Sequence, residues 1–389
     1  MPSSDSPGLS MPFATFRRSV FGLGSDRIHS LESNRSPVGQ NTEFELFQNK
    51  VFKRFHDLSI AKADEFLSLT WVSKLLDALI DCQEEFGVLL CKHKVEISKP
   101  PIDKMVLDYF ERSIKALDIC NATRDGIDMI RLWNKHLDMV LSAFGSQQRI
   151  IGEGTFRRAR KALTELALVM LDDKGSGSVV SHRNKSFGWH NKGKEQHYRL
   201  PGHSRSLSWS VSHSWSATKQ LQSIASTVVP PRAHEITETN GLAVPVFTMS
   251  FVLMFVLWAL VAAIPCQDRS LQIHFSIPRQ FSWSTPFYLI HVRIMDESKK
   301  RDRRSSIGLL QEIYQLESSV RRITDIVDSV HFPMTEEQKE ESKLAVKEST
   351  LVCETCRNEM DPLERQLMEV FRKIMSSRIE GLAILGRGN

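Results

Sequence analysis

The stretch SFVLMFVLWALVAAIPC, residues 250–266, contains no charged side chain and decides how the rest of the chain can pack. With the residues before it, the apolar run extends over 242–264. A helix that rises about 1.5 Å per residue over this length would span a hydrocarbon core of roughly 30 Å. A helix that is apolar on every side is also typical of the buried centre of a helical bundle. The run therefore predicts a central helix with two open interpretations, a membrane span or a buried or peripherally associated segment.

The sequence around this run slightly favours a buried or peripherally associated helix. Pro245 shortens the uninterrupted helix to 246–264. Lys and Arg follow at Arg269, Arg279, Arg293 and the run SKKRDRR, which would keep the C-terminal third cytoplasmic in a spanning topology. The N-terminal part would then cross the membrane without a signal segment. Residues that would contact lipid in that topology are Val246, Phe251, Leu253, Phe255, Leu257, Trp258, Leu260 and Ile264.

Upstream of the apolar run, apolar residues recur at steps of three and four in four segments, which is the spacing of one helix face. Proline at SKPP (98–101) separates the second segment from the third. We therefore expect an antiparallel helical bundle over residues 42–175, after a flexible N-terminal arm at 1–41. The main stripe residues are Phe44, Phe47, Val51, Phe55 and Leu58; Val72, Leu75, Leu79, Phe86 and Leu90; Val106, Phe110, Leu117, Ile127, Ile130, Trp133, Leu137 and Val140; and Phe156, Ala159, Leu163, Leu166, Ala167 and Met170.

Residues 176–241 differ from both flanks, because Lys, Arg, Ser, His and Trp are interleaved without a helical or strand period. This composition predicts a disordered basic linker. Serines that follow arginine in RSLSWS and RRSS suggest phosphorylation sites at Ser206, Ser208, Ser305 and Ser306, where phosphate would reverse the local charge. An unmodified, solvated linker is the alternative.

The region 266–389 is expected to form a helical hairpin or three-helix unit. Thr335 and Gln338 have the spacing of a capping box, and Asp361 before Pro362 indicates a second helix start. Leu363, Leu367, Val370, Phe371 and Ile374 would stripe that last helix. A seam of seven apolar residues precedes these signals and could serve either as core or as a partner-binding surface: Leu309, Ile313, Leu316, Val320, Ile323, Val327 and Val330.

The composition and motifs favour a folded binding protein over an enzyme. Of 389 residues, 41% are hydrophobic and 25% charged, and the net charge of +5 is too small to indicate a nucleic-acid binder. Six scattered cysteines favour a reducing, cytosolic setting. Cys353 and Cys356 could suit zinc or redox chemistry but lack further ligands at matching spacing, so packing is the preferred interpretation. We expect no catalytic, cofactor-binding or metal-binding residues.

Several ordered blocks resemble the ROH branch of the plant BYPASS-like proteins. They are SKPPIDKMVLDYFERSIKALDICNATRDGI, GEGTFRRARKALTELALVMLDDK, WALVAAIPCQDRSLQIHFSIPRQFSW, HVRIMDESKKRDRR and DPLERQLMEVF, and the likeness extends from about Glu43 to Gly386. The resemblance implies an all-α protein that binds the seventy-kilodalton exocyst subunit and influences secretion or development. The wider family implies an alternative, a single-pass membrane regulator of root-derived small-molecule signalling. Neither implies a cofactor or a catalytic residue.

Overall fold

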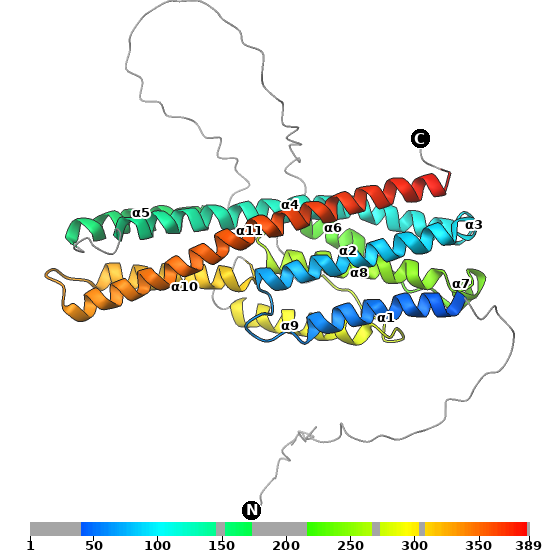
Figure 1. Cartoon of the computed structure of the whole chain (residues 1–389), viewed down its shortest axis with the longest axis horizontal. Helices are drawn as coiled ribbons and strands as arrows, with labels where there is room; N and C mark the ends of the chain where they lie inside the picture. Colours follow the sequence, from blue (N-terminus) through cyan, green and yellow to red (C-terminus); the bar gives the residue numbers. More distant parts are fainter. Residues whose placement is uncertain (1–39, 145–151, 173–215, 267–272, 303–307, 387–389) are drawn as a thin grey trace, which may run out of the picture. The chain divides into compact units, whose positions relative to one another are not determined.

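The computed structural model describes residues 40–144, 152–172, 216–266, 273–302 and 308–386, and every regular element in these ranges is an α-helix (Figure 1). The all-α prediction is thus confirmed. The helices are α1 (Gln40–Ser59), α2 (Leu69–Lys92), α3 (Lys94–Ile97), α4 (Ile102–Phe144), α5 (Glu153–Asp172), α6 (Ala217–Ala225), α7 (Ala233–Glu238), α8 (Ala243–Ala263), α9 (Ser284–Asp302), α10 (Gln311–Ser329) and α11 (Glu336–Ile384).

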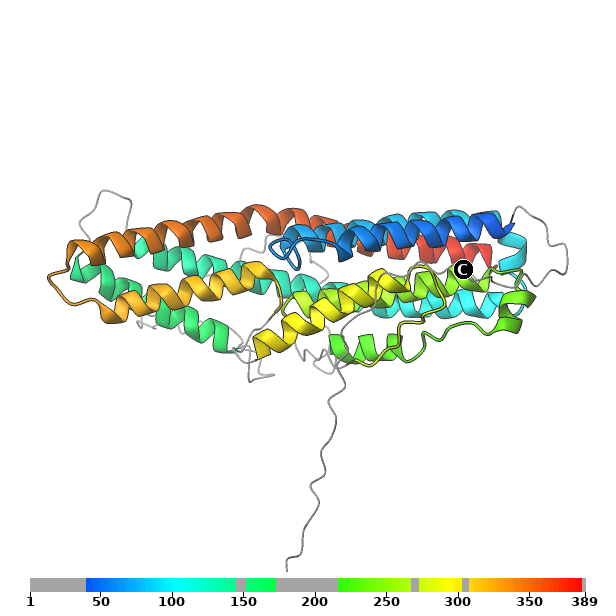
Figure 2. The ribbon, with the colours of Figure 1, turned by 90° about the horizontal axis from the view of Figure 1, so that it is seen from below.

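The apolar helix α8 lies inside the bundle, in contact with α1, α2, α4, α6 and α9 (Figures 1 and 2). All but one of its residues are buried, and they face every direction around the helix axis. The surrounding helices supply the apolar stripes that the sequence predicts. All the stripe residues of α1 and α2 are buried, as are those of α4 apart from the half-buried Leu117. Removal of this apolar surface from water is the main favourable term for folding.

Two long helices, α4 and α11, connect the two ends of the bundle. At one end they pack with α2, and α4 also contacts α8 and α6; at the other end α4 packs with α5, and α11 with α10. Aromatic rings join the second group, with Phe156 of α5 at 5.5 Å between ring centroids from both Phe144 and Phe332. On α5, Phe156, Ala159, Leu163 and Leu166 are buried, whereas Ala167 is exposed.

The last helix is longer than the sequence predicts. The capping box at its start is present, because Thr335 Oγ1 accepts from the Gln338 amide at 3.2 Å and Gln338 Oε1 accepts from the Thr335 amide at 3.1 Å. The predicted second start at Asp361 is absent, since α11 runs through Pro362 without a break. A proline removes one helical hydrogen bond, and packing of both flanks on α2 and α4 offsets that loss.

The region expected to be linker also contains ordered structure near its end. Residues 216–241 contain α6 and α7, and Ser216 caps α6 by accepting from the Lys219 amide at 3.4 Å. Buried Leu221 and Ile224 dock α6 onto α8 and α4. The segment is too short for its period to stand out among the surrounding Ser and Thr. The rest of that region, 176–215, lies outside the described residues, as does the expected arm apart from the first residues of α1.

The predicted N-terminal bundle and C-terminal unit are not separate in space. Helix α11 packs along α2 and α4, and the described residues form one compact unit. The separation expected from the order of segments fails because the apolar faces of α2 and α4 are wider than α1 and α5 can cover. Helices α8 and α11 cover the remainder.

Candidate interaction site

The eight residues that would contact lipid in a membrane-spanning topology are all buried by other parts of the chain, each no more than 1% exposed. Helix α8 is the one helix among the described residues that is long and apolar enough to cross a bilayer, with a mean hydropathy of 2.4. The two polar side chains within its apolar stretch, Thr248 and Ser250, each have a hydrogen-bond partner on another helix or segment. Length and hydropathy alone do not separate a membrane helix from the core helix of a bundle.

The partners of these two polar side chains come from different sides of the core. Gln48 Oε1 of α1 accepts from Thr248 Oγ1 at 3.0 Å and also from the indole N–H of Trp283. On another side, the guanidinium of Arg112 donates to Ser250 Oγ at 3.1 Å and to the Thr227 carbonyl at 3.3 Å. Arg112 is buried and forms no ion pair within the described part of the chain, and burial lowers its pKa. These bonds fix which side of α8 faces which helix.

The seam proposed as a partner surface is used mostly for internal packing. Leu309, Ile313, Leu316, Ile323 and Val327 are buried, while Val320 and Val330 are half-buried. The helix begins at Gln311, so Leu309 belongs to the connection before it. Helix α10 directs this face toward α11, α5 and α4. In this structure the seam is therefore core.

Cys353 and Cys356 are buried on the inner face of α11, and burial raises the pKa of each thiol to about 12, so neither is a thiolate near neutral pH. No group of three His, Cys, Asp or Glu side chains suited to a metal ion occurs within the described ranges. The predicted phosphorylation sites Ser206, Ser208, Ser305 and Ser306 lie outside those ranges.

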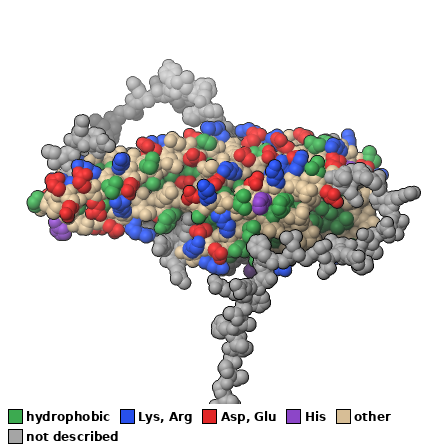
Figure 3. All heavy atoms as spheres, turned by 60° about the horizontal axis from the view of Figure 1, so that its bottom comes forward, with side chains coloured by type: hydrophobic (Ala, Val, Ile, Leu, Met, Phe, Trp, Pro, Cys, Tyr) green, Lys and Arg blue, Asp and Glu red, His purple; other side chains and the backbone are tan. Residues whose placement is uncertain are grey.

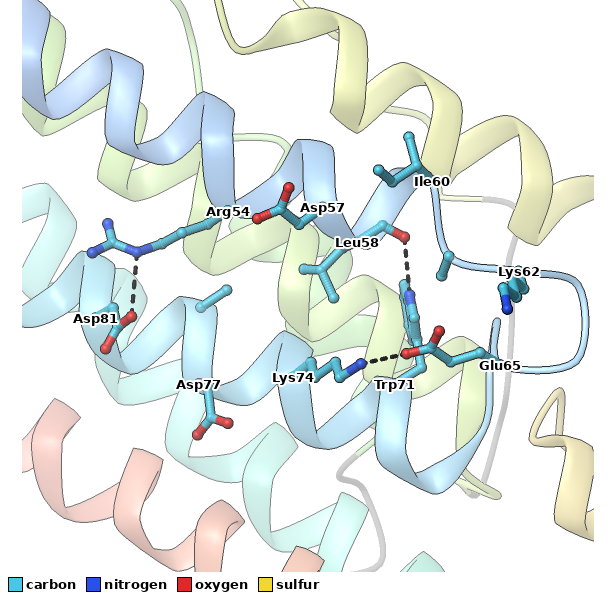
Figure 4. Close-up of a pocket in the computed structure, with 12 residues that line it drawn as sticks. Arg54, Asp57, Leu58, Ile60, Lys62, Glu65, Trp71, Lys74, Asp77 and Asp81 are labelled. Carbon is cyan, nitrogen blue, oxygen red and sulfur yellow. Dashed lines mark hydrogen bonds and ion pairs between the residues drawn. The ribbon is translucent and has the colours of Figure 1, made fainter.

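A groove that sequence reasoning missed opens where the C-terminal end of α1 meets the first half of α2 (Figure 4). Its volume is about 540 Å³. Apolar side chains form the floor, and charged side chains of both signs form the rim. The lining residues are Arg54, Asp57, Leu58, Ile60, Ala61, Lys62, Glu65, Trp71, Lys74, Asp77, Ala78 and Asp81.

The loop at one end of the groove, residues 60–68, is held by the start of α10. The side chain of Gln311 donates to the carbonyls of Ala63 at 2.7 Å and Phe66 at 2.9 Å, and the Gln311 amide donates to the Leu67 carbonyl at 2.9 Å. Glu312 accepts from the Leu69 amide at 3.1 Å. Three hydrogen bonds from Gln311 therefore fix a loop that lies more than 240 positions away in the sequence, and Glu312 holds the first residue of α2.

Helix α9 holds the same loop from another side. Arg293 donates to the Ser59 carbonyl at 2.7 Å, and its guanidinium lies 3.8 Å from the centre of the Phe66 ring. A cation over an aromatic face contributes about 0.5–2 kcal/mol, depending on solvent exposure. The loop is thus braced by α9 and α10 together.

These contacts hold a strained backbone. Leu67 has φ +63, in the left-handed region that a bulky residue occupies at a cost of about 1–3 kcal/mol. This turn directs Ser68 to cap α2 by accepting from the Trp71 amide at 3.1 Å, and the Trp71 indole N–H donates to the Leu58 carbonyl at 3.1 Å. The indole ring is fully buried and forms part of the groove floor. The groove is therefore preformed.

The rim carries ion pairs along its length. Arg54 contacts Asp81 at 3.3 Å and Glu85 at 2.7 Å, while Lys74 pairs with Glu65 (Figure 4). Burial opposes the charge of Arg54, but its hydrogen bond to Glu85 and the attraction of neighbouring negative groups together outweigh that effect and raise the pKa of Arg54. Asp77 accepts from the side-chain amide of Gln366. A rigid apolar floor with a charged rim is suited to the side chains of another protein.

The sequence gives only a weak signal for this groove. Ile60 follows the last position of the α1 stripe and stays 62% exposed, in a loop otherwise rich in Lys, Asp and Glu. The groove also depends on Gln311, Glu312 and Arg293, which are distant in sequence and carry no motif.

Over the described residues, the fold and groove define one all-helical unit with a buried apolar helix and a preformed groove between α1 and α2. Comparison with known proteins gives the family. The profile described as "Protein ROH1-like" matches residues 10–385, and the chain belongs to the ROH1-like family. No solved structure matches it.

Three relatives show how far the likeness extends. The chain is 51% identical to Protein ROH1D of Arabidopsis thaliana over 387 residues, 96% of this chain and 97% of that one. It is 34% identical to Protein ROH1A of the same plant over 380 residues, 89% and 90% of the two chains. UPF0496 protein 4 of Oryza sativa subsp. japonica is 22% identical over 261 residues, 67% of this chain and 49% of that protein.

Proposed function

We propose that this protein is a non-enzymatic regulatory adaptor that binds the seventy-kilodalton exocyst subunit in plant cells and influences secretion or development. The partner comes from the family resemblance. The observation that carries a binding role is the α1–α2 groove, whose loop is fixed by α9 and α10 before any partner arrives. A preformed surface avoids the ordering cost that weakens association.

The groove has the composition of a small protein-binding centre. Exposed Ile60 offers an apolar contact at one end, and the charged rim can define orientation. Over the face shown in Figure 3, Lys and Arg are interspersed with Asp and Glu, without a broad field of one sign. That distribution favours a protein partner over nucleic acid, which requires a continuous basic surface.

Direct binding of the purified full-length chain to the purified exocyst subunit tests this function. Titration calorimetry should give a saturable interaction, and Ile60→Glu should weaken it about tenfold or more, because a carboxylate would enter an apolar contact. Leu168→Glu is the matched control, because Leu168 is also 62% exposed but lies on α5, away from the groove. Absence of any interaction between the wild-type proteins would refute the proposal.

The second candidate is a single-pass membrane regulator of BYPASS-type small-molecule signalling. The length and apolarity of α8 favour it. The contacts of Gln48 and Arg112 with Thr248 and Ser250 oppose it, because an α8 surrounded by lipid would lose those partners. We therefore propose a cytosolic protein with peripheral membrane association at most. Extraction of plant membranes at high salt and then at alkaline pH discriminates, since resistance to both would favour the spanning protein.

A further inference from the structure

We propose that the α1–α2 groove binds a basic amphipathic helix of the partner protein, with Lys or Arg side chains at Asp57 and Asp77 and an aliphatic side chain against Ile60. This inference rests on the proposed function, because it assigns the contact surface of the adaptor. The shape of the groove and the charges of its lining both favour this one class of occupant.

The shape of the groove fits a helix. Its α1 wall consists of Arg54, Asp57 and Leu58, continued by Ala61 of the loop, and its α2 wall of Trp71, Lys74, Asp77, Ala78 and Asp81. Along each wall, lining residues recur at steps of three and four positions, so each wall includes a ridge along its helix. A third helix can lie between two such ridges and insert a side chain above the small Ala78. An amphipathic helix in a groove is a common mode of peptide recognition.

The charges within the groove favour a basic occupant. The lining contains three Lys or Arg and four Asp or Glu side chains, and two of the cations already pair with Asp81 and Glu65. Among the described residues, Asp57 has no ion pair, and Asp77 contacts an uncharged amide of Gln366. Figure 4 shows Asp57 on α1 and Asp77 on α2, with the side chain of Asp77 directed away from α1.

The remaining cation of the lining, Lys62, would set the orientation of a bound helix. Lys62 projects from the loop at the end of the groove and has no ion pair within the described residues. A partner helix with basic residues along its middle and an acidic residue toward the loop would match all three unpaired charges. Anionic lipid does not fit this pattern, because its headgroups would face Asp57 and Asp77. Complementary charge of this kind governs orientation and association rate.

The test uses the full-length chain and two fluorescently labelled synthetic peptides of equal length, one with a helical Leu/Lys pattern and one with the same Leu positions and Glu in place of Lys. Fluorescence anisotropy should show binding of the Lys peptide. The double variant Asp57→Lys/Asp77→Lys should weaken that binding about tenfold and strengthen binding of the Glu peptide, because the rim charges are reversed. Both mutated side chains are exposed, so circular dichroism should show an unchanged fold.

The matched control is Asp64→Lys/Glu354→Lys, which changes net charge equally at exposed carboxylates outside the groove lining. Equal weakening of Lys-peptide binding by the control and groove variants would overturn the inference, since it would show attraction to overall charge. Equal affinity of the wild-type chain for both peptides would overturn it too. Sedimentation of the wild-type chain as a dimer that the groove variant abolishes would identify a second copy as occupant and also overturn it.

The same variants separate this inference from the proposed function. If the exocyst subunit binds wild type and the groove variant equally, the groove assignment fails while the adaptor function stands. If the subunit does not bind but the Lys peptide binds and responds to charge reversal, the adaptor function fails while the groove assignment stands.

Discussion

At the scale of single residues, two helical glycines occupy opposite environments. A Cβ at Gly126 of α4 would lie 2.0 Å from the Pro265 carbonyl oxygen and 2.7 Å from a methyl carbon of Ile264, whereas a Cβ at Gly87 of α2 would meet no heavy atom within 4 Å. Gly126→Ala should therefore lower the free energy of unfolding by about 3 kcal/mol, through overpacking against backbone. Gly87→Ala should raise it by about 0.5–1 kcal/mol, because alanine favours helix.

Urea unfolding followed by far-ultraviolet circular dichroism measures both changes. The two changes in unfolding free energy should have opposite signs, although both substitutions replace a helical glycine with alanine. If Gly126→Ala were neutral, the close approach of α4 to the end of α8 would be wrong.

A half-buried carboxyl predicts a dependence of stability on pH. Burial raises the pKa of Asp118 to about 6 from an ordinary value of 3.8. The folded state therefore holds this proton more tightly than the unfolded state, and the stability that it contributes is lost as pH rises from about 4 to about 6. After allowance for the partial solvent exposure of Asp118, Asp118→Asn should stabilise the protein by about 1 kcal/mol at pH 7.

The comparison needs wild type and Asp118→Asn at several pH values, because groups such as Glu85, whose pKa is lowered by Arg54 and Lys50 against the effect of burial, act in the opposite direction. The difference in unfolding free energy between the two proteins should grow between pH 4 and pH 6 and then level off. A difference independent of pH would show that the side chain is well solvated.

At the scale of the helix, the apolar run predicts that α8 exists but not how it is rotated about its axis. Apolar side chains on every face leave the rotation undetermined, so the polar contacts of Thr248 and Ser250 have to specify it. Buried polar groups are known to select one packing arrangement in some proteins, at a cost in stability. In α8 this role falls to Gln48, Trp283 and Arg112, which bond to those two side chains.

If these polar contacts set the rotation of α8, the effects of substitutions at Ser250 and Arg112 on stability should be non-additive. Ser250→Ala should lower the free energy of unfolding by about 1–3 kcal/mol, because it leaves part of the buried Arg112 guanidinium without its hydrogen bond. Arg112→Met in the same chain should recover much of that loss, since the unsatisfied charge is removed. A double-mutant cycle by urea unfolding measures the coupling, and strict additivity of the two changes would contradict the contact.

How well each helix was predicted depends on the length of its periodic pattern. The stripes of α1, α2, α4 and α5 repeat over several turns, and those helices and most of their buried residues follow from sequence. Helix α6 offers only Ala217, Leu221 and Ile224, too few to show a period. Asp361 and Pro362 carry a valid start signal that packing on both flanks overrides.

The candidate groove was not predictable for a different reason. Its walls belong to neighbouring helices, but its rigidity comes from Gln311, Glu312 and Arg293, more than 200 residues further along the chain. No local pattern reports which distant side chain will brace a loop. Likewise, the seam from Leu309 to Val330 shows that one face of α10 is apolar but not whether its cover is α11 or another protein.

At the scale of the whole molecule, the arrangement of α8 and α11 makes the predicted N-terminal bundle dependent on the C-terminal half. Helices α2 and α4 bury apolar side chains against α8 and α11, both of which are absent from a fragment of residues 42–175. That fragment would expose a large apolar surface, so it should bind a hydrophobic dye and lack a near-ultraviolet circular dichroism signal. Its far-ultraviolet signal should still be partly helical.

Co-expression with residues 216–389 should restore a compact complex, because the second fragment supplies α8, α11 and the α9 and α10 residues that brace the groove. Size-exclusion chromatography should show one species containing both fragments, with little dye binding. A 42–175 fragment that folds cooperatively on its own would contradict the single-unit architecture. In that event α8 would no longer be required as core, and a membrane-inserted α8 would become the better explanation of its apolar surface.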